Sequence, residues 1–526
     1  MITVQLAAAV SAAAPCPALQ QAETPARWRP ERLQALLDQA TANGVVPGVV
    51  VGLITPQGRC VLGSGRSGNP ARPQVDERTL FELASISKGF TGALLAEAER
   101  RGELRVDDSL AQSFGGRLPE PLRGNPRLDA LTWRQLSTHT SGLPRIPLRQ
   151  WAFIKAMARN PEDPYAHYAV QDFYAYLRGL DFQGPADYAY SNTGVALLGM
   201  LLAARAGKDL EHGYAELVQE RLLGPLGLND TRVGAPADAA RMARGHDQKG
   251  QPVPAWTMRF WAPTGGIIAN VEDTLRLLQA ALEGHPALVR AMGGPQAQAL
   301  APYGKKSGGV ALNWHLARLG AQEGEPASLA WHNGGTYGMR SFAGVDLARG
   351  MAVVVLTNSG ASDFSDELGL HLWDARHPQP STDAPEAAGW KPVQQLLLLA
   401  LLPSGLALGA KGWASRASAA SRVPATGRLQ RAWQAFSRPF ASRWEAGLAG
   451  LSTLASAAFI CSFLPPLSLD GLSVYALWQG ALVLTGVLAC VWSRHLPAHQ
   501  LHSAKARWQS VGSVGLALVF LAWAWL

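Results

Sequence analysis

Residues 81–91 read FELASISKGFT, which predicts a turn leading into a helix. After Lys88 the apolar residues recur at helical spacing until Gly102, where the pattern ends. If the helix begins near Ser85, then Ser85 and Lys88 lie three residues apart on one helix face. Ser87 would point to another face. Ser85 is therefore the stronger candidate for a nucleophile.

A serine beside a lysine on a helix can do chemistry. A serine hydroxyl is a weak nucleophile, and a lysine can act as its base when burial or another cation keeps the amine partly neutral. The helix N-terminus adds backbone N–H groups where an alkoxide would develop. The Ser-x-x-Lys pattern alone also fits an exposed helix start with a capping serine. Other parts of the chain have to decide between these interpretations.

The surrounding segments predict regular structure. Residues 31–42 predict a helix, and residues 45–62 predict a hairpin with its turn at 56–58. Residues 351–358, MAVVVLTN, are the best candidate for a buried strand. Residues 151–177 are rich in aromatic side chains, which we interpret as core and a possible cleft wall.

Three short motifs occur in one order along the chain. They lie within the stretches FELASISK, YSNTGVALLG and WHNGGTYGMRSF, and a fourth stretch, LSTHTSGLP, lies between the first two. The motifs are Ser85-x-x-Lys88, Tyr190-x-Asn192 and His332-Asn333-Gly334. Together they resemble the penicillin-recognising serine hydrolases, in particular class C β-lactamases, D-Ala-D-Ala peptidases and related serine esterases. The resemblance covers roughly residues 30–360.

The resemblance implies an α+β fold of the β-lactamase/transpeptidase type. A mixed sheet would be covered by helices, and a helical lobe would form a cleft with it around Ser85. Residues 23–376 would make up this hydrolase domain. The glycine pair Gly334–Gly335 within a strand pattern independently suggests close approach of the backbone to a ligand.

The resemblance also implies roles for single residues. Ser85 would be acylated, and Lys88 would help to deprotonate it. Tyr190 would act as general base and pass its proton to the leaving group. Because a tyrosine has an unperturbed pKa of about 10, this role requires nearby cations such as Lys88. Asn192 would hydrogen-bond Lys88 and the substrate amide.

The third motif would bind the substrate through His332, Asn333 and Gly334. The backbone N–H groups of Ser85 and Gly335 would form the oxyanion hole. His139 lies in a predicted loop, and we expect it to shape that loop and not to take part in the chemistry.

The third motif departs from the pattern of the lactamases, which usually carry Lys-Thr-Gly here. His332 is charged only below its pKa, which is about 6.5 when unperturbed, so it grips a β-lactam carboxylate less well at neutral pH. We therefore expect an esterase or peptidase rather than a β-lactamase. Because histidine gains its charge as the pH falls, we also expect carboxylate-bearing substrates to bind more tightly toward about pH 6. The alternative is a hydrogen-bonded strand histidine.

The charge of the chain is unevenly placed. Residues 411–526 contain ten Lys/Arg and two acidic residues, which accounts for the formal net charge of +8. Basic residues cluster in alternate loops between apolar runs, as expected of membrane-spanning helices. The charge therefore indicates a membrane surface and not nucleic acid.

Four apolar runs follow a proline-rich linker at 377–392, and residues 393–526 are predicted to be a membrane domain of about four transmembrane helices. The runs are Val393–Ala410, Ala446–Leu467, Leu472–Trp492 and Val511–Leu526. A set of buried helices in a soluble domain is the alternative. The loop charges favour membrane helices with the catalytic domain outside the cytoplasm.

The N-terminal residues 1–22 resemble a secretory signal without a basic start. Cys16 lies in this segment, Cys461 and Cys490 lie in apolar runs, and Cys60 is left in the catalytic domain. We expect neither a disulfide framework nor a metal-binding cysteine pair.

These observations predict a serine hydrolase tethered to the inner membrane, multi-pass, with its catalytic domain on the extracytoplasmic side. It would form an acyl-enzyme with an ester, a D-amino-acid peptide or an amide, and its partners would be that substrate and membrane lipid. No metal or cofactor is implied. The alternatives are a β-lactamase and, from another class, a receptor that is acylated once and turns over slowly.

Overall fold

Strand β1, Gly48–Thr55, sends alternate side chains into two hydrophobic cores. Val49 and Val51 belong to one core, whereas Val50 and Ile54 belong to the other. A strand buried on both faces has no polar alternation, which explains why β1 reads as an uninterrupted apolar run.

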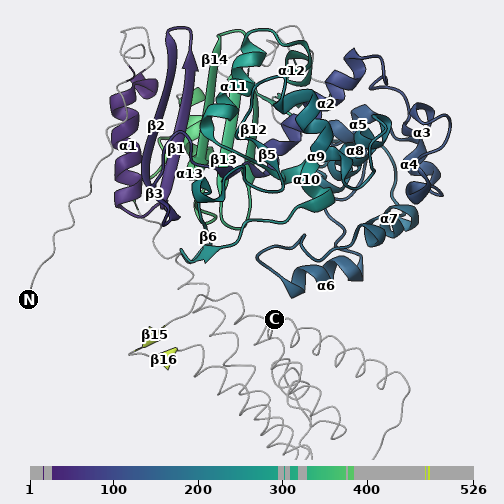
Figure 1. Ribbon diagram of the computed structural model, residues 1–526, viewed down its shortest axis with the longest axis horizontal. Coiled ribbons are helices and arrows are strands. Elements are labelled where there is room, and N and C mark those ends of the chain that lie inside the picture. Colours follow the sequence, from purple (N-terminus) through teal and green to yellow (C-terminus); the bar gives the residue numbers. More distant parts are fainter. Residues whose placement is uncertain are drawn as a thin grey trace, which may run out of the picture. The chain divides into compact units, whose positions relative to one another are not determined.

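β1 lies in a nine-stranded sheet of order β3-β2-β1-β14-β13-β12-β11-β10-β9 (Figure 1). All described pairings in this sheet are antiparallel, so the expected mixed sheet is wrong. Short turns join β1 to β2, β10 to β11, β12 to β13 and β13 to β14, and they impose this direction on these pairs because a parallel neighbour needs a long crossover. The other strands are β2 (Gly58–Asn69), β3 (Arg72–Gln74), β9 (Ala301–Pro302), β10 (Gly308–Val310), β11 (His315–Ala317), β12 (Leu329–Gly335), β13 (Arg340–Asp346) and β14 (Met351–Thr357).

Helices cover both faces of this sheet. α1 (Pro30–Ala42) and α13 (Phe364–Trp373) share one core with it, while α11 (Val271–Leu282) packs on the other face against β1 and β14. Figure 1 shows the sheet between these helices, with α2 (Ser87–Arg100) and α12 (Pro286–Ala291) beyond α11. The predicted helix at 31–42, the hairpin and the strand at 351–358 are confirmed by α1, β1–β2 and β14.

A helical lobe occupies the other side of the catalytic unit (Figure 1). Its aromatic centre joins Phe153, Tyr168, Phe173 and Trp261, with Phe153 and Tyr168 at 5.0 Å between ring centroids. The interpretation of residues 151–177 as core holds for Phe153, Tyr168 and Phe173, which are all buried. The lobe contains α3 (Leu110–Ser113), α4 (Pro126–Ala130), α5 (Trp133–Ser137), α6 (Trp151–Arg159), α7 (Val170–Gly179), α8 (Asn192–Arg205), α9 (Gly213–Val218) and α10 (Ala262–Gly265).

Small sheets join the lobe to the rest. β4 (Phe81–Glu82) and β5 (Arg232–Val233) flank β8 (Ile267–Ala269), and β6 (Gly245–His246) pairs with β7 (Pro252–Val253). β4 leads directly into the turn that carries Ser85. This small sheet therefore fixes the entry to the candidate site.

The computed structural model describes Cys16 and residues 26–293, 301–302, 308–317, 329–374, 377–383, 468–469 and 472–473. The chain divides into two units, residues 1–385 and 386–526. In the second unit, β15 (Ser468–Leu469) pairs with β16 (Leu472–Ser473). No helix among the described residues is long and apolar enough to cross a membrane. The expected spans lie almost wholly outside the described residues, as does most of the signal-like segment at 1–22.

A disulfide bond joins Cys16 to Cys60 on β2, with 5.4 Å between their Cα atoms. Both cysteines are buried in the core under α1. The expectation of no disulfide is therefore wrong. The partners are 44 residues apart, and only the folded chain brings the N-terminal segment alongside β2. Cysteine spacing alone carries no such information.

We expect Cys60→Ser to lower the free energy of unfolding by about 4 kcal/mol, because the bond restricts a long loop in the unfolded chain. Urea unfolding under oxidising conditions measures this change. Cys461→Ser, which leaves the bond intact, serves as the control. Equal stability of Cys60→Ser and the unsubstituted chain would show that the bond does not form.

Candidate active site

Ser85 lies in a single 3-10 turn, Ala84–Ile86, between β4 and α2. The helix itself begins at Ser87, two residues later than Ser85. Ala84 has a φ of 48°, in the left-handed region that costs free energy for a residue with a Cβ atom. Such backbone strain is common at functional sites, where the surrounding structure holds it.

Strand β12 packs directly against this turn. A Cβ atom on Gly334 would lie 2.3 Å from the carbonyl oxygen of Leu83 and 3.0 Å from the Cβ atom of Ala84. Ser341 on β13 also donates to the Leu83 carbonyl at 2.8 Å. Gly334 is thus needed for contact between two backbones, and this contact places Gly335 beside the Ser85 turn.

Lys88 is fully buried behind Ser85. Its Nζ lies 3.0 Å from Ser85 Oγ and donates to the carbonyl of Thr264 at 2.6 Å. Burial, and next the charge of Arg145, lower the pKa of Lys88 well below its usual value. This direction favours the neutral amine, which has a lone pair to accept the serine proton.

Tyr190 approaches Ser85 from the other side. Its hydroxyl donates to Ser85 Oγ at 2.9 Å. Two basic side chains lie against its ring, with Lys88 Nζ 5.0 Å and Arg145 Cζ 5.1 Å from the centroid. The imidazole of His139 lies 4.5 Å from the same ring centroid. Ser85, Lys88 and Tyr190 are thus brought together as expected from the motifs.

The loop before α6 holds Tyr190 in place. Ser191 caps α8 by accepting from Gly194 N at 2.9 Å, and the Ser191 N–H donates to His139 Nδ1 at 3.2 Å. The carbonyl of Arg145 accepts from Asn192 N at 3.0 Å. His139 therefore shapes the loop, in agreement with its interpretation from sequence.

Asn192 does not bond Lys88 as expected. Its Oδ1 is buried and has no hydrogen-bond partner in the described part of the chain, whereas Lys88 Nζ is directed to Ser85 and Thr264. Asn192 lies near Tyr165, whose pKa is raised to about 12 by burial. The Thr264 carbonyl accepts the hydrogen bond from Lys88 that Asn192 was expected to accept.

Asn333 does not face the site either. Its Nδ2 donates to Asp366 Oδ2 on α13 at 2.6 Å, on the opposite side of the sheet. Side chains alternate along a strand, so His332 and Gly334 face the Ser85 side while Asn333 faces α13. The Asn333 side chain is thus held on the α13 side, and the substrate-binding role of Asn333 stays a prediction that only its backbone could fulfil. Burial raises the pKa of its partner Asp366 to about 6.

His332 is buried, with 1% of its surface exposed. Its Nδ1 lies 2.6 Å from the carbonyl oxygen of Asn333, so Nδ1 carries the proton and donates. Burial, followed by the charges of His315 and Lys88, lowers the pKa of His332 well below its usual value. His332 was expected to become protonated near its unperturbed pKa of about 6.5, and this expectation does not hold. At neutral pH it presents the lone pair of Nε2.

Sequence reasoning missed three residues of the site. Arg145, which lies over the Tyr190 ring, directly follows LSTHTSGLP and belongs to no motif. Thr264 contributes its backbone carbonyl, which accepts from Lys88. The ring of His315 on β11 is tilted against that of His332, with 4.7 Å between the ring centroids, and burial lowers the pKa of His315 to about 4. All three act through contacts between distant segments, which no local pattern reports.

Glu82 on β4 was also missed. It is buried, and it accepts from Trp256 N at 2.7 Å and from Thr336 Oγ1 at 3.0 Å. Burial raises the pKa of Glu82 to about 7. Glu82 precedes Ser85 by three residues, and Thr336 directly follows Gly335. The hydrogen bond between Glu82 and Thr336 therefore connects the two segments expected to supply the oxyanion hole.

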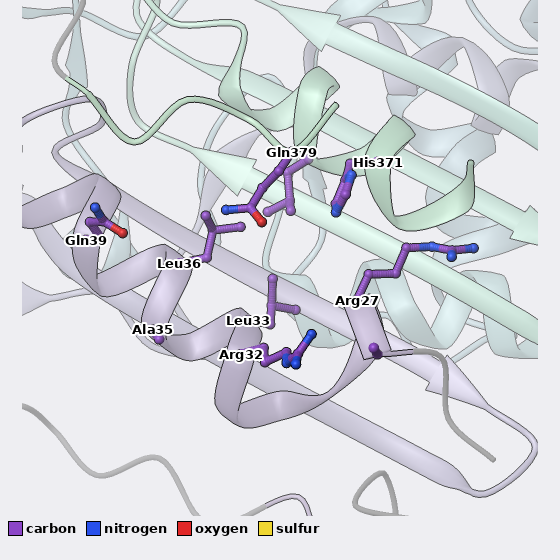
Figure 2. A pocket seen from close by; sticks show the side chains of 10 residues that line it. Arg27, Arg32, Leu33, Ala35, Leu36, Gln39, His371 and Gln379 are labelled. Carbon is purple, nitrogen blue, oxygen red and sulfur yellow. The ribbon is translucent and has the colours of Figure 1, made fainter. Parts of the chain in front are cut away.

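A cavity of about 610 Å³ lies away from this site, between α1 and the segment that follows α13. Figure 2 shows Arg27 and His371 near one end and Gln39 near the other, with Leu33 and Leu36 between them. None of the motif residues lines it. Within the described ranges, no group of three or more His, Cys, Asp or Glu is placed to hold a metal ion.

The fold and the Ser85 site define an acyl-transferring serine hydrolase. The family model described as Beta-lactamase matches residues 33–376. The chain therefore belongs to the β-lactamase family of serine hydrolases, which confirms the resemblance to penicillin-binding proteins and class C β-lactamases.

Curated relatives include a β-lactamase of Lysobacter lactamgenus, 32% identical over 47% of this chain and 60% of the relative. Another is a D-alanyl-D-alanine-carboxypeptidase/endopeptidase AmpH of Escherichia coli (strain K12), 27% identical over 41% of this chain and 52% of the relative. The chain thus spans about half to three fifths of the length of these relatives.

Solved structures share the fold. A class C β-lactamase of Rhodobacter sphaeroides has a TM-score of 0.51 at 23% identity, covering 64% of this chain and 97% of that one. A β-lactamase/D-alanine carboxypeptidase of Pseudomonas syringae has a TM-score of 0.53 at 19% identity, covering 66% and 100%. These likenesses confirm the α+β fold of the β-lactamase type.

The role of Arg145 gives a pH prediction. Removing its charge in Arg145→Gln takes away one cause of the lowered Lys88 pKa, so that pKa rises. Because neutral Lys88 is the reactive form, we expect the acid limb of kcat/KM to move to higher pH. The pH–rate profile with an activated ester measures it. Arg149→Gln is the control, and an unmoved limb in Arg145→Gln would contradict the electrostatic role.

Proposed function

We propose that this protein is a membrane-tethered serine hydrolase that acts through an acyl-enzyme on an ester, a D-amino-acid peptide or an amide. The observation that carries the proposal is the convergence of Lys88 Nζ and Tyr190 Oη on Ser85 Oγ, at 3.0 and 2.9 Å. Neutral Lys88 takes the proton as Ser85 attacks the carbonyl carbon. Tyr190 then delivers its proton to the leaving group and recovers a proton from protonated Lys88, so both side chains return to their starting states.

The preference for esters and peptides rests on His332. A neutral imidazole whose Nδ1 proton is committed to the Asn333 carbonyl offers a lone pair, not a positive charge. A substrate carboxylate at this place would meet an acceptor, which is unfavourable. A neutral ester or an amide N–H has no such conflict.

A β-lactamase is the second candidate. The names of the curated relatives favour it, since the relative from Lysobacter lactamgenus is a β-lactamase. The relative from Escherichia coli is named for a peptidase, so relatives of both kinds match this chain. The buried His332 supports the first candidate.

Export of the catalytic domain is part of the proposal. The disulfide between Cys16 and Cys60 supports it, because disulfides persist in oxidising compartments outside the cytoplasm. The alternating loop charges of residues 393–526 support a tether in the inner membrane. The two arguments are independent, one resting on redox chemistry and the other on charge.

A burst-and-turnover assay on the full chain tests the proposal. The substrates are an activated ester, a D-alanyl amide and a chromogenic cephalosporin. We expect a stoichiometric burst and continued turnover with the ester or the amide. Fastest turnover of the cephalosporin would favour the β-lactamase, and a burst without turnover would favour the acylated receptor.

His332 gives a second pH prediction. Because its pKa lies well below the usual value, its charge is absent throughout the neutral range. We expect the ratio of kcat/KM for a penicillin to that for a neutral ester to stay constant from about pH 8 to about pH 6. His332→Gln, which cannot titrate, should give the same flat ratio. If this ratio rises toward about pH 6 in the unsubstituted chain but not in His332→Gln, then His332 becomes charged in that range.

A further inference from the structure

The surface of residues 145–159 differs from an ordinary protein surface. It contains α6 and the loop before it, and we call it the α6 surface. All of its exposed side chains are either basic or large and apolar: Arg145, Leu148, Arg149, Trp151, Ile154, Lys155 and Arg159. No acidic residue occurs in this segment.

The apolar side chains here are strongly exposed. Trp151 is 68% exposed, Leu148 56% and Ile154 36%. They are three of the four large hydrophobic side chains that are exposed in the described part of the chain. Monomeric soluble proteins rarely gather such side chains in one patch, and patches of this kind mark interaction sites.

Packing of the lobe does not explain this exposure. α6 is already anchored by Phe153, which packs edge-on against Tyr168 and is fully buried, and by the buried Ala156. α6 is therefore amphipathic, and its outer face is itself half apolar. Figure 1 shows α6 at the lower margin of the helical lobe, away from the large sheet.

We propose that the α6 surface docks on a bilayer of anionic phospholipid. Tryptophan and aliphatic side chains enter the headgroup boundary, while the basic side chains around them attract the lipid phosphates. The charge argues against a second copy of this chain, because a symmetric contact would place basic residues against basic residues. The inference goes beyond the proposed hydrolase activity and does not rest on it.

Docking would bring the catalytic centre close to the lipid. Arg145, at the start of the α6 surface, lies with its guanidinium over the ring of Tyr190. The same loop that positions the catalytic tyrosine therefore continues into the docking surface. The catalytic centre would therefore lie on the side of the domain that faces the membrane.

A fluorescent label on α6 tests docking in the full chain. An environment-sensitive dye is attached to Ile154→Cys in a chain whose Cys461 and Cys490 are replaced by serine. The chain is placed in nanodiscs of phosphatidylglycerol with phosphatidylcholine, or of phosphatidylcholine alone. We expect a blue shift and quenching by spin-labelled lipid in the anionic discs. The same dye on Ala35→Cys, an exposed position on α1, is the matched control and should show neither.

Charge reversal separates docking from simple proximity to a tethered chain. The triple substitution Arg149→Glu, Lys155→Glu and Arg159→Glu should weaken docking by at least about fivefold for each residue and reduce the signal at position 154. Hydrolysis of a soluble ester should be unchanged, because these residues do not touch the site. A signal that is equal at positions 154 and 35, that is the same without anionic lipid, or that survives charge reversal would overturn the proposal. So would a signal in detergent that grows with protein concentration, since it would indicate self-association.

Discussion

Ser85→Ala is expected to abolish both turnover and covalent labelling by an active-serine probe. The loss in kcat should be on the order of a millionfold, as found when a serine nucleophile that works with a base is removed. Both Lys88 Nζ and Tyr190 Oη lie within 3.0 Å of Ser85 Oγ, so both groups are directed at this hydroxyl. Mass spectrometry of the labelled chain and a rate assay measure the two losses.

Ser87→Ala is the matched control. The Ser87 hydroxyl is buried and accepts from Ile267 N at 2.9 Å, which gives it a structural part on β8. We expect labelling to persist while the free energy of unfolding falls by about 1 kcal/mol. Labelling retained in Ser85→Ala and lost in Ser87→Ala would reverse the assignment of the nucleophile.

Lys88→Met and Tyr190→Phe should each reduce the acylation rate by about a thousandfold, near the upper range for one acid–base group. The double variant should be only slightly slower than either single variant, because groups that act on one proton are strongly non-additive. The structure supports this coupling, since both side chains end on the same oxygen and Lys88 also lies against the Tyr190 ring.

Pre-steady-state acylation with an activated ester measures all four rates of the cycle. Methionine keeps the volume of the buried lysine, so loss of packing is small. Thermal unfolding of each variant checks that the fold is kept. Losses that multiply to about a millionfold in the double variant would mean that the two residues do not share one proton relay.

Local patterns in the sequence located the parts of the catalytic centre. The spacing of Ser85 and Lys88 and the turn before Asn192 depend on a few neighbouring residues, and the chain folds them as expected. Helix α1, the β1–β2 hairpin and strand β14 also follow from periodicity. These features were predictable because a period of 3.6 or 2 residues is a property of a continuous segment.

Side-chain direction at the third motif was less predictable. The sequence places His332, Asn333 and Gly334 on a strand, and alternation along that strand turns Asn333 toward Asp366. Which face looks at Ser85 depends on the contact of Gly334 with Leu83, some 250 residues earlier in the chain. One shift in register would have exchanged the two side chains.

The sequence by itself determined the family, the order of the three motifs and the candidate nucleophile, because each is written in contiguous residues. Only the tertiary structure decided that Cys16 meets Cys60, that Arg145 lies over Tyr190 and that Lys88 bonds Thr264 in place of Asn192. It also decided that His332 is neutral, since burial sets its pKa. Contacts between distant segments and the removal of water are consequences of the whole fold, and a local pattern carries neither.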